Sequence, residues 1–190
     1  IEFEIKGQPE DYIDLNSSYL YLKLKVIKTD NTNPGADARV APVNNFMHSL
    51  FSEVDLYLNN KLVSSSMDTY AYRTHLENLL TYGKKANNNH LAACVVWKPD
   101  TSDEATFNDT ALTEDDNRHN VDVNYRRKKI LQGRNLELMD RLHLDMWLQD
   151  KYLLNEVDIR LRLNRSSVAF HLMAHANEYK TIIQEARSVT

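Results

Sequence analysis

Apolar and polar residues alternate with a period of two in three separate stretches of the sequence, at residues 19–26, 53–58 and 157–163. This alternation is typical of β-strands that have one buried and one exposed face. The predicted inward side chains are all aliphatic: Leu20, Leu22, Leu24, Val26, Val54, Leu56, Leu58, Val157, Ile159, Leu161 and Leu163. Because an aliphatic sheet face needs a second layer to cover it, the pattern predicts two facing sheets.

Further strands are predicted near residues 1–5, 61–64, 91–97, 135–144, 168–173 and 179–186. Asn59 and Asn60 separate two of the predicted strands and favour a tight hairpin, because asparagine tolerates positive φ. Seven or eight short strands joined by polar loops indicate an all-β fold, an antiparallel two-sheet Greek-key sandwich.

One stretch, from Asp68 to Tyr82, has the period of an amphipathic helix instead. Its predicted inward residues are Tyr72, Leu76, Leu79 and Leu80, and its predicted polar side includes Arg73, Glu77, Asn78 and Thr81. Asp68 is a suitable N-cap, and Gly83 stands where a left-handed residue would end the helix. Shorter helical turns are predicted at residues 44–51 and 146–150.

A polar insertion at about residues 98–124 interrupts the pattern. Between Asp100 and Asp116 it has seven acidic residues and no basic ones, which predicts an exposed loop. The 190 residues as a whole suit a single domain. With 23 Lys and Arg against 27 Asp and Glu, the chain lacks the positive excess of a general nucleic-acid binder.

Motifs for catalysis or cofactor binding are absent from the sequence, so we expect no enzyme activity, no cofactor and no metal. His171 and His175 have zinc-ligand spacing only on a helix, and their stretch reads as a strand. His143, with Asp140 and Asp145 nearby, allows a catalytic dyad, but a hydrogen-bonded histidine at a strand edge is the favoured interpretation. The single cysteine, Cys94, reads as a buried side chain.

The only basic run is Arg126–Lys129. It is a weak candidate for nucleic-acid contact or nuclear import, and a solvated loop end is the favoured interpretation. No uncharged apolar run is long enough to span a bilayer, so we expect no membrane insertion.

Two blocks of sequence resemble a known family. The first reads PVNNFMHSLFSEVDLYLN at residues 42–59 and continues as YAYRTHLENLLTYG at residues 70–83. The second comprises residues 142–145, 149–150, 153–155, 157–163 and 170–173, and residues 12–15 also fit. In order and spacing these blocks resemble the major capsid proteins of Polinton (Maverick) elements and adintoviruses.

The resemblance implies a double jelly-roll capsid protein of the adenovirus-like lineage. Residues 1–190 would be its first, eight-stranded jelly roll, although the sequence also allows a stand-alone single sandwich. The implied role is structural: copies form trimers of pseudo-hexagonal outline, and trimers tile an icosahedral shell with penton and minor capsid proteins. The implied location is the virion capsid, after assembly inside the host cell, with the nucleus as a candidate compartment.

The candidate contact residues are Tyr19, Tyr21, Arg73, Glu77, Asp109 and Asp115. Two other functions remain open at this point. One is a carbohydrate- or receptor-binding sandwich that uses the 98–124 loop and exposed tyrosines, and the other, ranked last, is a metal-dependent sandwich enzyme.

Overall fold

The structure, a computed structural model, describes residues 1–64, 68–83, 121–174 and 178–189. Most of its elements are strands, which confirms the all-β prediction. They are β1 (Glu2–Ile5), β2 (Tyr19–Lys28), β3 (Val40–Pro42), β4 (Phe51–Leu58), β5 (Lys61–Leu62), β6 (Asn135–Asp140), β7 (Ile159–Arg165), β8 (Leu172–Ala174) and β9 (Tyr179–Val189). The helices are α1 (Phe46–Ser49), α2 (Tyr70–Thr81), α5 (Val121–Ile130) and α6 (Val168–His171), with 3₁₀ turns η1 (Leu15–Ser17) and η2 (Leu131–Gly133).

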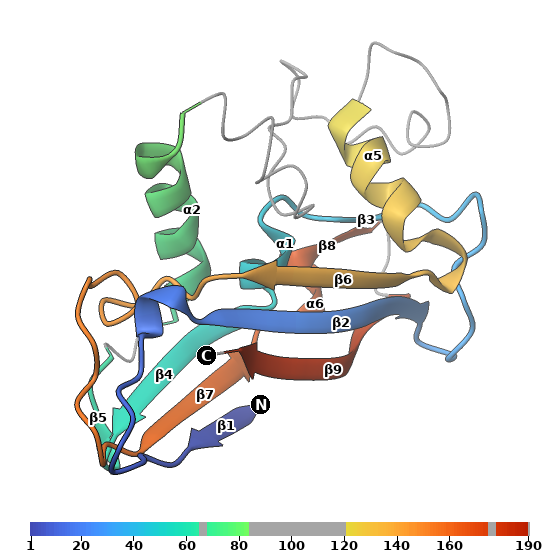
Figure 1. Cartoon of the computed structure of the whole chain (residues 1–190). Coiled ribbons are helices and arrows are strands. Elements are labelled where there is room, and N and C mark those ends of the chain that lie inside the picture. The colour runs from blue at the N-terminus through green and yellow to red at the C-terminus, as the bar shows by residue number, and fades with distance from the viewer. Residues whose placement is uncertain (65–67, 84–120, 175–177, 190) are drawn as a thin grey trace.

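The strands form antiparallel sheets with the orders β1-β7-β4-β5, β6-β2-β9 and β3-β8 (Figure 1). Successive strands of the chain cross between the sheets, as Greek-key connections do. Strand β2 is central to its sheet and pairs with β9 along its whole length and with β6 from Leu20 to Lys25. The precise count of an eight-stranded jelly roll stays a prediction.

The two larger sheets share one hydrophobic core. Leu22, Leu24 and Val26 of β2 are fully buried, and they face Leu56 of β4 and Leu161 of β7 in the same cluster. Of the predicted inward residues, only Leu58 and Val157 are less than fully buried. The alternating pattern therefore predicted the burial of these strands correctly.

Asn59 and Asn60 form the predicted tight turn between β4 and β5. Their φ angles are 48° and 66°, and Leu58 pairs with Lys61 directly across the turn. Two consecutive positive φ angles define the turn type whose twist suits a two-residue hairpin.

Three strand predictions need correction. The stretch 168–173 is a helical turn, α6, followed by the short strand β8, because its unbroken apolar sequence fits a buried turn as well as a strand. Strand β6 ends at Asp140, so residues 141–144 lie in a connection. The three-residue strand β3 was not predicted, and residues 146–150 contain a turn but no helix. The strand predicted at residues 91–97, which includes Cys94, lies outside the described residues.

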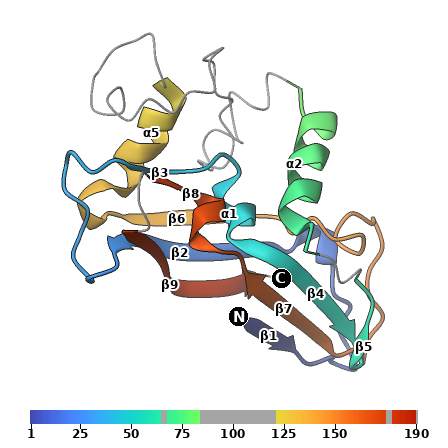
Figure 2. The ribbon, with the colours of Figure 1, turned by 180° about the vertical axis from the view of Figure 1, so that it is seen from behind.

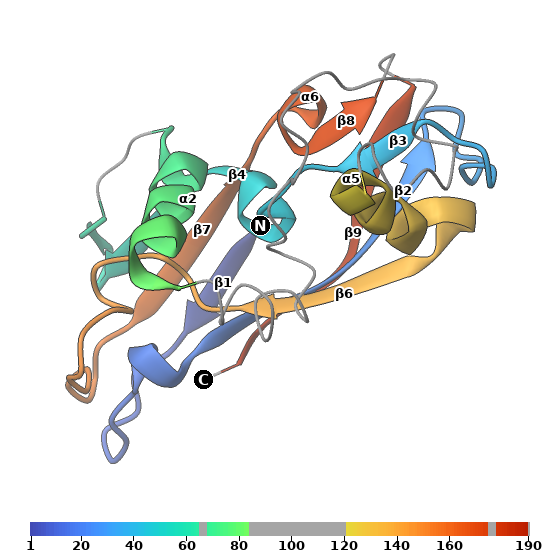
Figure 3. The same ribbon diagram turned by 90° about the horizontal axis from the view of Figure 1, so that it is seen from above.

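Helices α2 and α5 stand on the same side of the sheets at opposite ends of the molecule (Figures 1 and 2). Seen from above, α2 lies beside β4 and α5 lies beside β3 (Figure 3). The predicted end of the 98–124 loop is wrong, because residues 121–124 form the beginning of α5.

The basic run 126–129 belongs to α5, so the prediction of a solvated loop end is wrong for half of it. Arg126 and Arg127 are buried, with 1% and 4% of their surface exposed. Arg126 donates from Nε to the Pro42 carbonyl at 2.9 Å, and Arg127 donates to the carbonyls of Ala38 and Ala36 at 2.8 and 2.7 Å. These two arginines link α5 by hydrogen bonds to the segment that contains β3. Because their side chains are buried, they are not available to nucleic acid.

Candidate interaction site at helix α2

Helix α2 forms where the sequence predicts it, but it faces the other way. Tyr72, Leu76, Leu79 and Leu80 are 60%, 57%, 52% and 86% exposed, although they were the predicted inward face. The buried positions are Tyr70, Ala71, Thr74 and Asn78. We call the four exposed apolar residues the α2 apolar face.

The orientation follows from a polar contact between α1 and α2. Asn45, which directly precedes α1, donates from Nδ2 to the Thr74 hydroxyl at 2.8 Å, and Thr74 donates to the Ala71 carbonyl at 2.8 Å. Asn45, Thr74 and Asn78 are each at most 2% exposed. Small and polar side chains allow a close approach of the two helices, and the large apolar side chains point away from it.

The predicted ends of α2 also differ from the structure. The N-cap is Thr69, which makes no side-chain capping bond, so Asp68 is not the cap. The helix ends at Tyr82 in an extended conformation, and Gly83 does not adopt positive φ.

A polar cluster with a buried centre at His48 and Tyr70 joins α2 to α1 and to the connection after β6. It comprises His48 of α1, Tyr70, Arg73 and Glu77 of α2, and Asp140, His143 and Asp145, and we call it the anchor cluster. His48 Nδ1 lies 3.0 Å from the Tyr70 hydroxyl, and His48 Nε2 lies 3.3 Å from Asp140 Oδ2. His143 Nδ1 lies 2.7 Å from Glu77 Oε2.

The two imidazole rings of the anchor cluster touch. The ring centroids of His48 and His143 are 4.9 Å apart, and the rings meet edge to face at 89°. His48 is 1% exposed, and the backbone N–H of His143 donates to the Tyr70 hydroxyl at 3.4 Å. Each imidazole thus has its own carboxylate, and Tyr70 links the two histidine residues.

Burial changes the acidity of this cluster. It raises the pKa of the Tyr70 hydroxyl far above its ordinary value. Burial and the neighbouring His48 lower the pKa of His143, against an opposing effect of Glu77. Burial also opposes ionisation of Asp140, but the hydrogen bond and charge of His48 outweigh it, so the Asp140 pKa is lowered. Asp140 is therefore a carboxylate, and Tyr70 a neutral hydroxyl, at neutral pH.

Arg73 and Glu77, two of the predicted contact residues, take part in this cluster. Arg73 donates to Glu77 at 2.7 Å and to Asp145 at 2.6 Å. The favoured interpretation of His143 as a hydrogen-bonded histidine fits this arrangement, although its partner is Glu77 and it lies beyond the strand. His48 and Tyr70 were missed as site residues. They are 22 residues apart in the sequence, and Asp140, the other partner of His48, is 92 residues from it.

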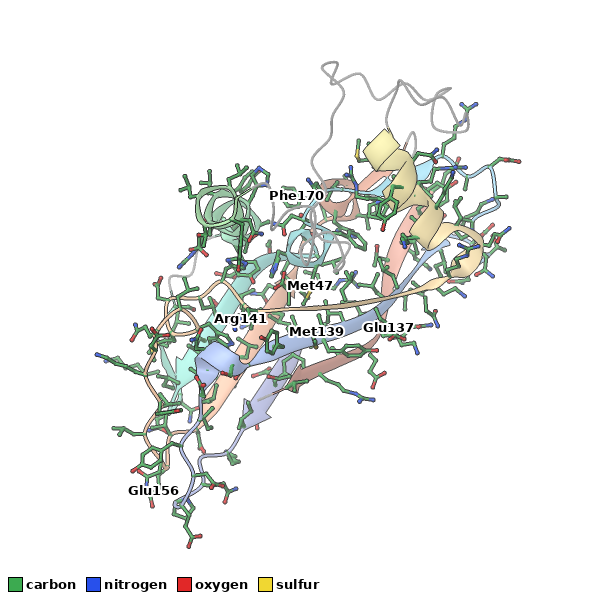
Figure 4. All side chains as sticks on the ribbon, turned by 45° about the horizontal axis from the view of Figure 1, so that its top comes forward. Met47, Glu137, Met139, Arg141, Glu156 and Phe170 are labelled. Carbon is green, nitrogen blue, oxygen red and sulfur yellow. The ribbon has the colours of Figure 1, made fainter. Side chains whose placement is uncertain are left out.

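The predicted contact residues Tyr19 and Tyr21 lie elsewhere, on the outer face of the β6-β2-β9 sheet. The guanidinium of Arg141 is 5.4 Å from the Tyr19 ring and that of Arg187 is 5.9 Å from the Tyr21 ring, so both rings are half-covered. Met139, next to Tyr21 on β6, is 49% exposed (Figure 4). Asp109 and Asp115 lie outside the described residues.

A groove runs along β9, the outer strand of its sheet. Its volume is about 840 Å³, and its lining includes Ile1, Arg165, Val168 and residues 180–186. Arg165 donates across it to the Thr181 carbonyl at 2.9 Å.

Among the residues that the structure describes, no three His, Cys, Asp or Glu side chains lie where they could hold one metal ion. The two ring nitrogens of His171 are hydrogen-bonded to the hydroxyls of Ser166 and Thr181. His175 lies outside the described residues. Among the same residues, no helix has the length and apolar character needed to cross a bilayer.

Comparison with known proteins gives a match to one protein whose function is not stated. No protein-family model matches the chain. A stretch of 106 residues is 30% identical to an uncharacterized protein of Caenorhabditis elegans, and the match covers 52% of this chain and 25% of that protein. The match thus spans about a quarter of the relative's length, and the name of the relative states no activity.

Proposed function

We propose that this chain is a structural shell subunit, the first jelly roll of a major capsid protein that associates with copies of itself. The observation that carries the proposal is the α2 apolar face, whose four side chains are each more than half exposed. A contiguous apolar surface of this kind on a soluble domain is typical of a protein interaction site. An all-β sandwich with its polar groups used for internal packing suits a protein whose function is shape and contact area.

The occupant that we propose for the α2 apolar face is a second copy of the chain. A ring of three copies joins two different patches of the same chain head to tail, and an apolar face without charged side chains can pack against an apolar patch of the next copy. Tyr72 already packs edge to face with Phe170 of α6 at 5.7 Å, so the surface continues from α2 onto the body. Phe170 is itself 36% exposed.

The sequence resemblance and the length of the relative support the same proposal. Residues of the first resembling block build α1, β4 and α2, which are the elements that orient the α2 apolar face. The nematode relative is much longer than the matched stretch, which leaves length for a second sandwich. Trimers, a pseudo-hexagonal lattice, penton and minor capsid partners and a virion location belong to this proposal.

Light scattering coupled to size-exclusion chromatography, over a range of concentrations, tests the proposal. We expect oligomers at micromolar concentration, and a shift to monomer in the double variant Leu76→Glu with Leu80→Glu. The matched control is Met139→Glu, which changes an exposed apolar residue on a different face and should leave the oligomer intact. A monomer at every concentration would contradict self-association by this chain.

A further inference from the structure

Strand β9 has one edge without a partner strand. It pairs with β2 along its whole length, and no other described strand is hydrogen-bonded to it (Figure 1). Arg165 donates to the Thr181 carbonyl from the side of the groove, so the backbone of Thr181 faces the groove. Alternate residues of an antiparallel strand turn their backbone groups towards the same side, so the N–H and carbonyl of Ile183 face the groove as well. An unpaired edge of this kind is a template for a further strand.

The groove along this edge, which we call the β9 groove, has an apolar lining. Val168, Ile183 and Ala186 line it and also pack, partly buried, against the shared core. Its volume of about 840 Å³ is in the range of ligand-binding pockets. Because successive side chains of a strand point to opposite faces, every second side chain of an added strand would cover this lining.

The charged side chains in the lining of the β9 groove are Arg165, Lys180 and Glu185. Glu185 is ion-paired with Arg187, which lies outside the lining. Lys180 donates from Nζ to the side-chain oxygen of Asn31 at 2.7 Å, a neutral acceptor. Neither Lys180 nor Arg165 forms an ion pair with a carboxylate among the described residues. The β9 groove therefore has two cations that are open to an anionic partner.

Arg165 is the cation best placed to receive such a partner. The acceptor of its Nη2 is the neutral carbonyl of Thr181 at 2.9 Å. Burial lowers the pKa of Arg165 from its ordinary value, and burial together with the charge of Arg165 lowers the pKa of the neighbouring His171. A carboxylate is the natural complement of a partly desolvated guanidinium, because it can accept two parallel hydrogen bonds.

We propose that the β9 groove binds an extended acidic segment of another protein, which adds a strand to the free edge of β9 and places a carboxylate on Arg165. The backbone of β9 supplies hydrogen bonds, and the apolar lining and the two cations select the side chains. The β9 groove shares no residue with the α2 apolar face. The inference thus goes beyond the proposed self-association and can be tested separately from it.

Fluorescence anisotropy with labelled synthetic peptides tests the proposal on the whole chain. The probe is a peptide of alternating glutamate and valine, and its control has lysine in place of glutamate. We expect saturable binding of the glutamate peptide, at least tenfold tighter than that of the lysine peptide. Methylation of its backbone nitrogens at every second residue, on the side that would face β9, should abolish binding, because it removes the donors of strand pairing.

Arg165→Gln should weaken binding of the glutamate peptide at least fivefold. The matched control is Arg162→Gln, which removes an exposed arginine of the same strand that does not line the β9 groove. The variant with Leu76→Glu and Leu80→Glu should bind the peptide like the native chain. Loss of self-association in that variant therefore leaves this test intact.

Hydrogen exchange of the native chain gives a second measurement, which decides if Arg165→Gln does not fold. We expect the glutamate peptide to slow exchange of the Ile183 amide, which faces the β9 groove, and to leave the Ile182 amide, which faces β2, unchanged. Three results would overturn the proposal: no binding or equal binding of the two peptides, native affinity in Arg165→Gln, or an unchanged Ile183 amide. Protection of Ile183 that rises with protein concentration without peptide would instead assign the edge to a second copy.

Discussion

The sandwich and helix α2 place their apolar residues in opposite ways. In β2, β4 and β7 the alternating aliphatic residues point inward, and those of β2 are 0–1% exposed at Leu20, Leu22, Leu24 and Val26. In α2 the four residues of the apolar face are more than half exposed, and the buried positions include Thr74 and Asn78. A period in the sequence therefore shows which residues share a side, whereas the neighbouring elements determine which side is covered.

The contrast between the sandwich and α2 predicts its largest difference in stability for a leucine-to-aspartate substitution made once in each region. Leu22→Asp places an unpaired charge in the shared core, and we expect a loss of more than about 5 kcal/mol, enough to prevent folding. Leu76→Asp should cost less than about 1 kcal/mol, because the side chain is already exposed. Urea unfolding and the soluble yield measure both, and similar losses would contradict the described orientation of α2.

The next effect concerns a polar contact in the helical layer. Arg126→Met removes the donor to the Pro42 carbonyl and should lower the free energy of unfolding by about 2 kcal/mol. Lys128→Met, an exposed neighbour in the same basic run, should change it by less than about 0.5 kcal/mol. Equal effects would mean that Arg126 is not buried as described.

A pH effect is expected at His171 of α6. Burial and the charge of Arg165 lower the pKa of His171 from its ordinary value of 6.5 to about 4. The unfolded chain takes up this proton at higher pH than the folded chain, so stability present above pH 6.5 is lost as the pH falls towards 4. The loss is about 3 kcal/mol at most.

Urea unfolding at several pH values measures this contribution. His171→Gln should be less stable than the native chain at pH 7 but should lose less stability on acidification. His75→Gln serves as the exposed control and should follow the native profile. If the stability of His171→Gln falls with pH as steeply as that of the native chain, the acid sensitivity comes from other groups.

The smallest effect lies in the hairpin. Asn60 has φ 66°, which glycine adopts more easily than any other residue, so Asn60→Gly should stabilise the chain by about 0.5 kcal/mol. Asn60→Ala should destabilise it, because a Cβ without a local hydrogen bond disfavours this region. Thermal unfolding would show shifts of opposite sign, and shifts of the same sign would argue against this turn.

The sequence predicted the parts of the fold whose signal is local. The inner faces of β2, β4 and β7, the Asn59–Asn60 turn and the existence of α2 all follow from patterns within a few residues. The anchor cluster could not be predicted, because His48 meets Tyr70 and Asp140 only after α1, α2 and β6 have packed. The buried state of Arg126 was hidden for the same reason, since its acceptor is 84 residues away.

Candidate contact residues were predicted with mixed outcomes. Arg73 and Glu77 do lie at the proposed site, but they hold α2 in place through ion pairs. The residues that form its apolar face were assigned to the core. Tyr19 and Tyr21 lie on another face, where arginines cover them in part.

Negative-stain electron microscopy of the purified full-length protein tests the central claim most directly. The account predicts trimers with a hexagonal outline at micromolar concentration, and their disappearance when Leu76 and Leu80 are both replaced by glutamate. Uniform monomers at every concentration, or trimers that persist unchanged in that variant, would contradict it.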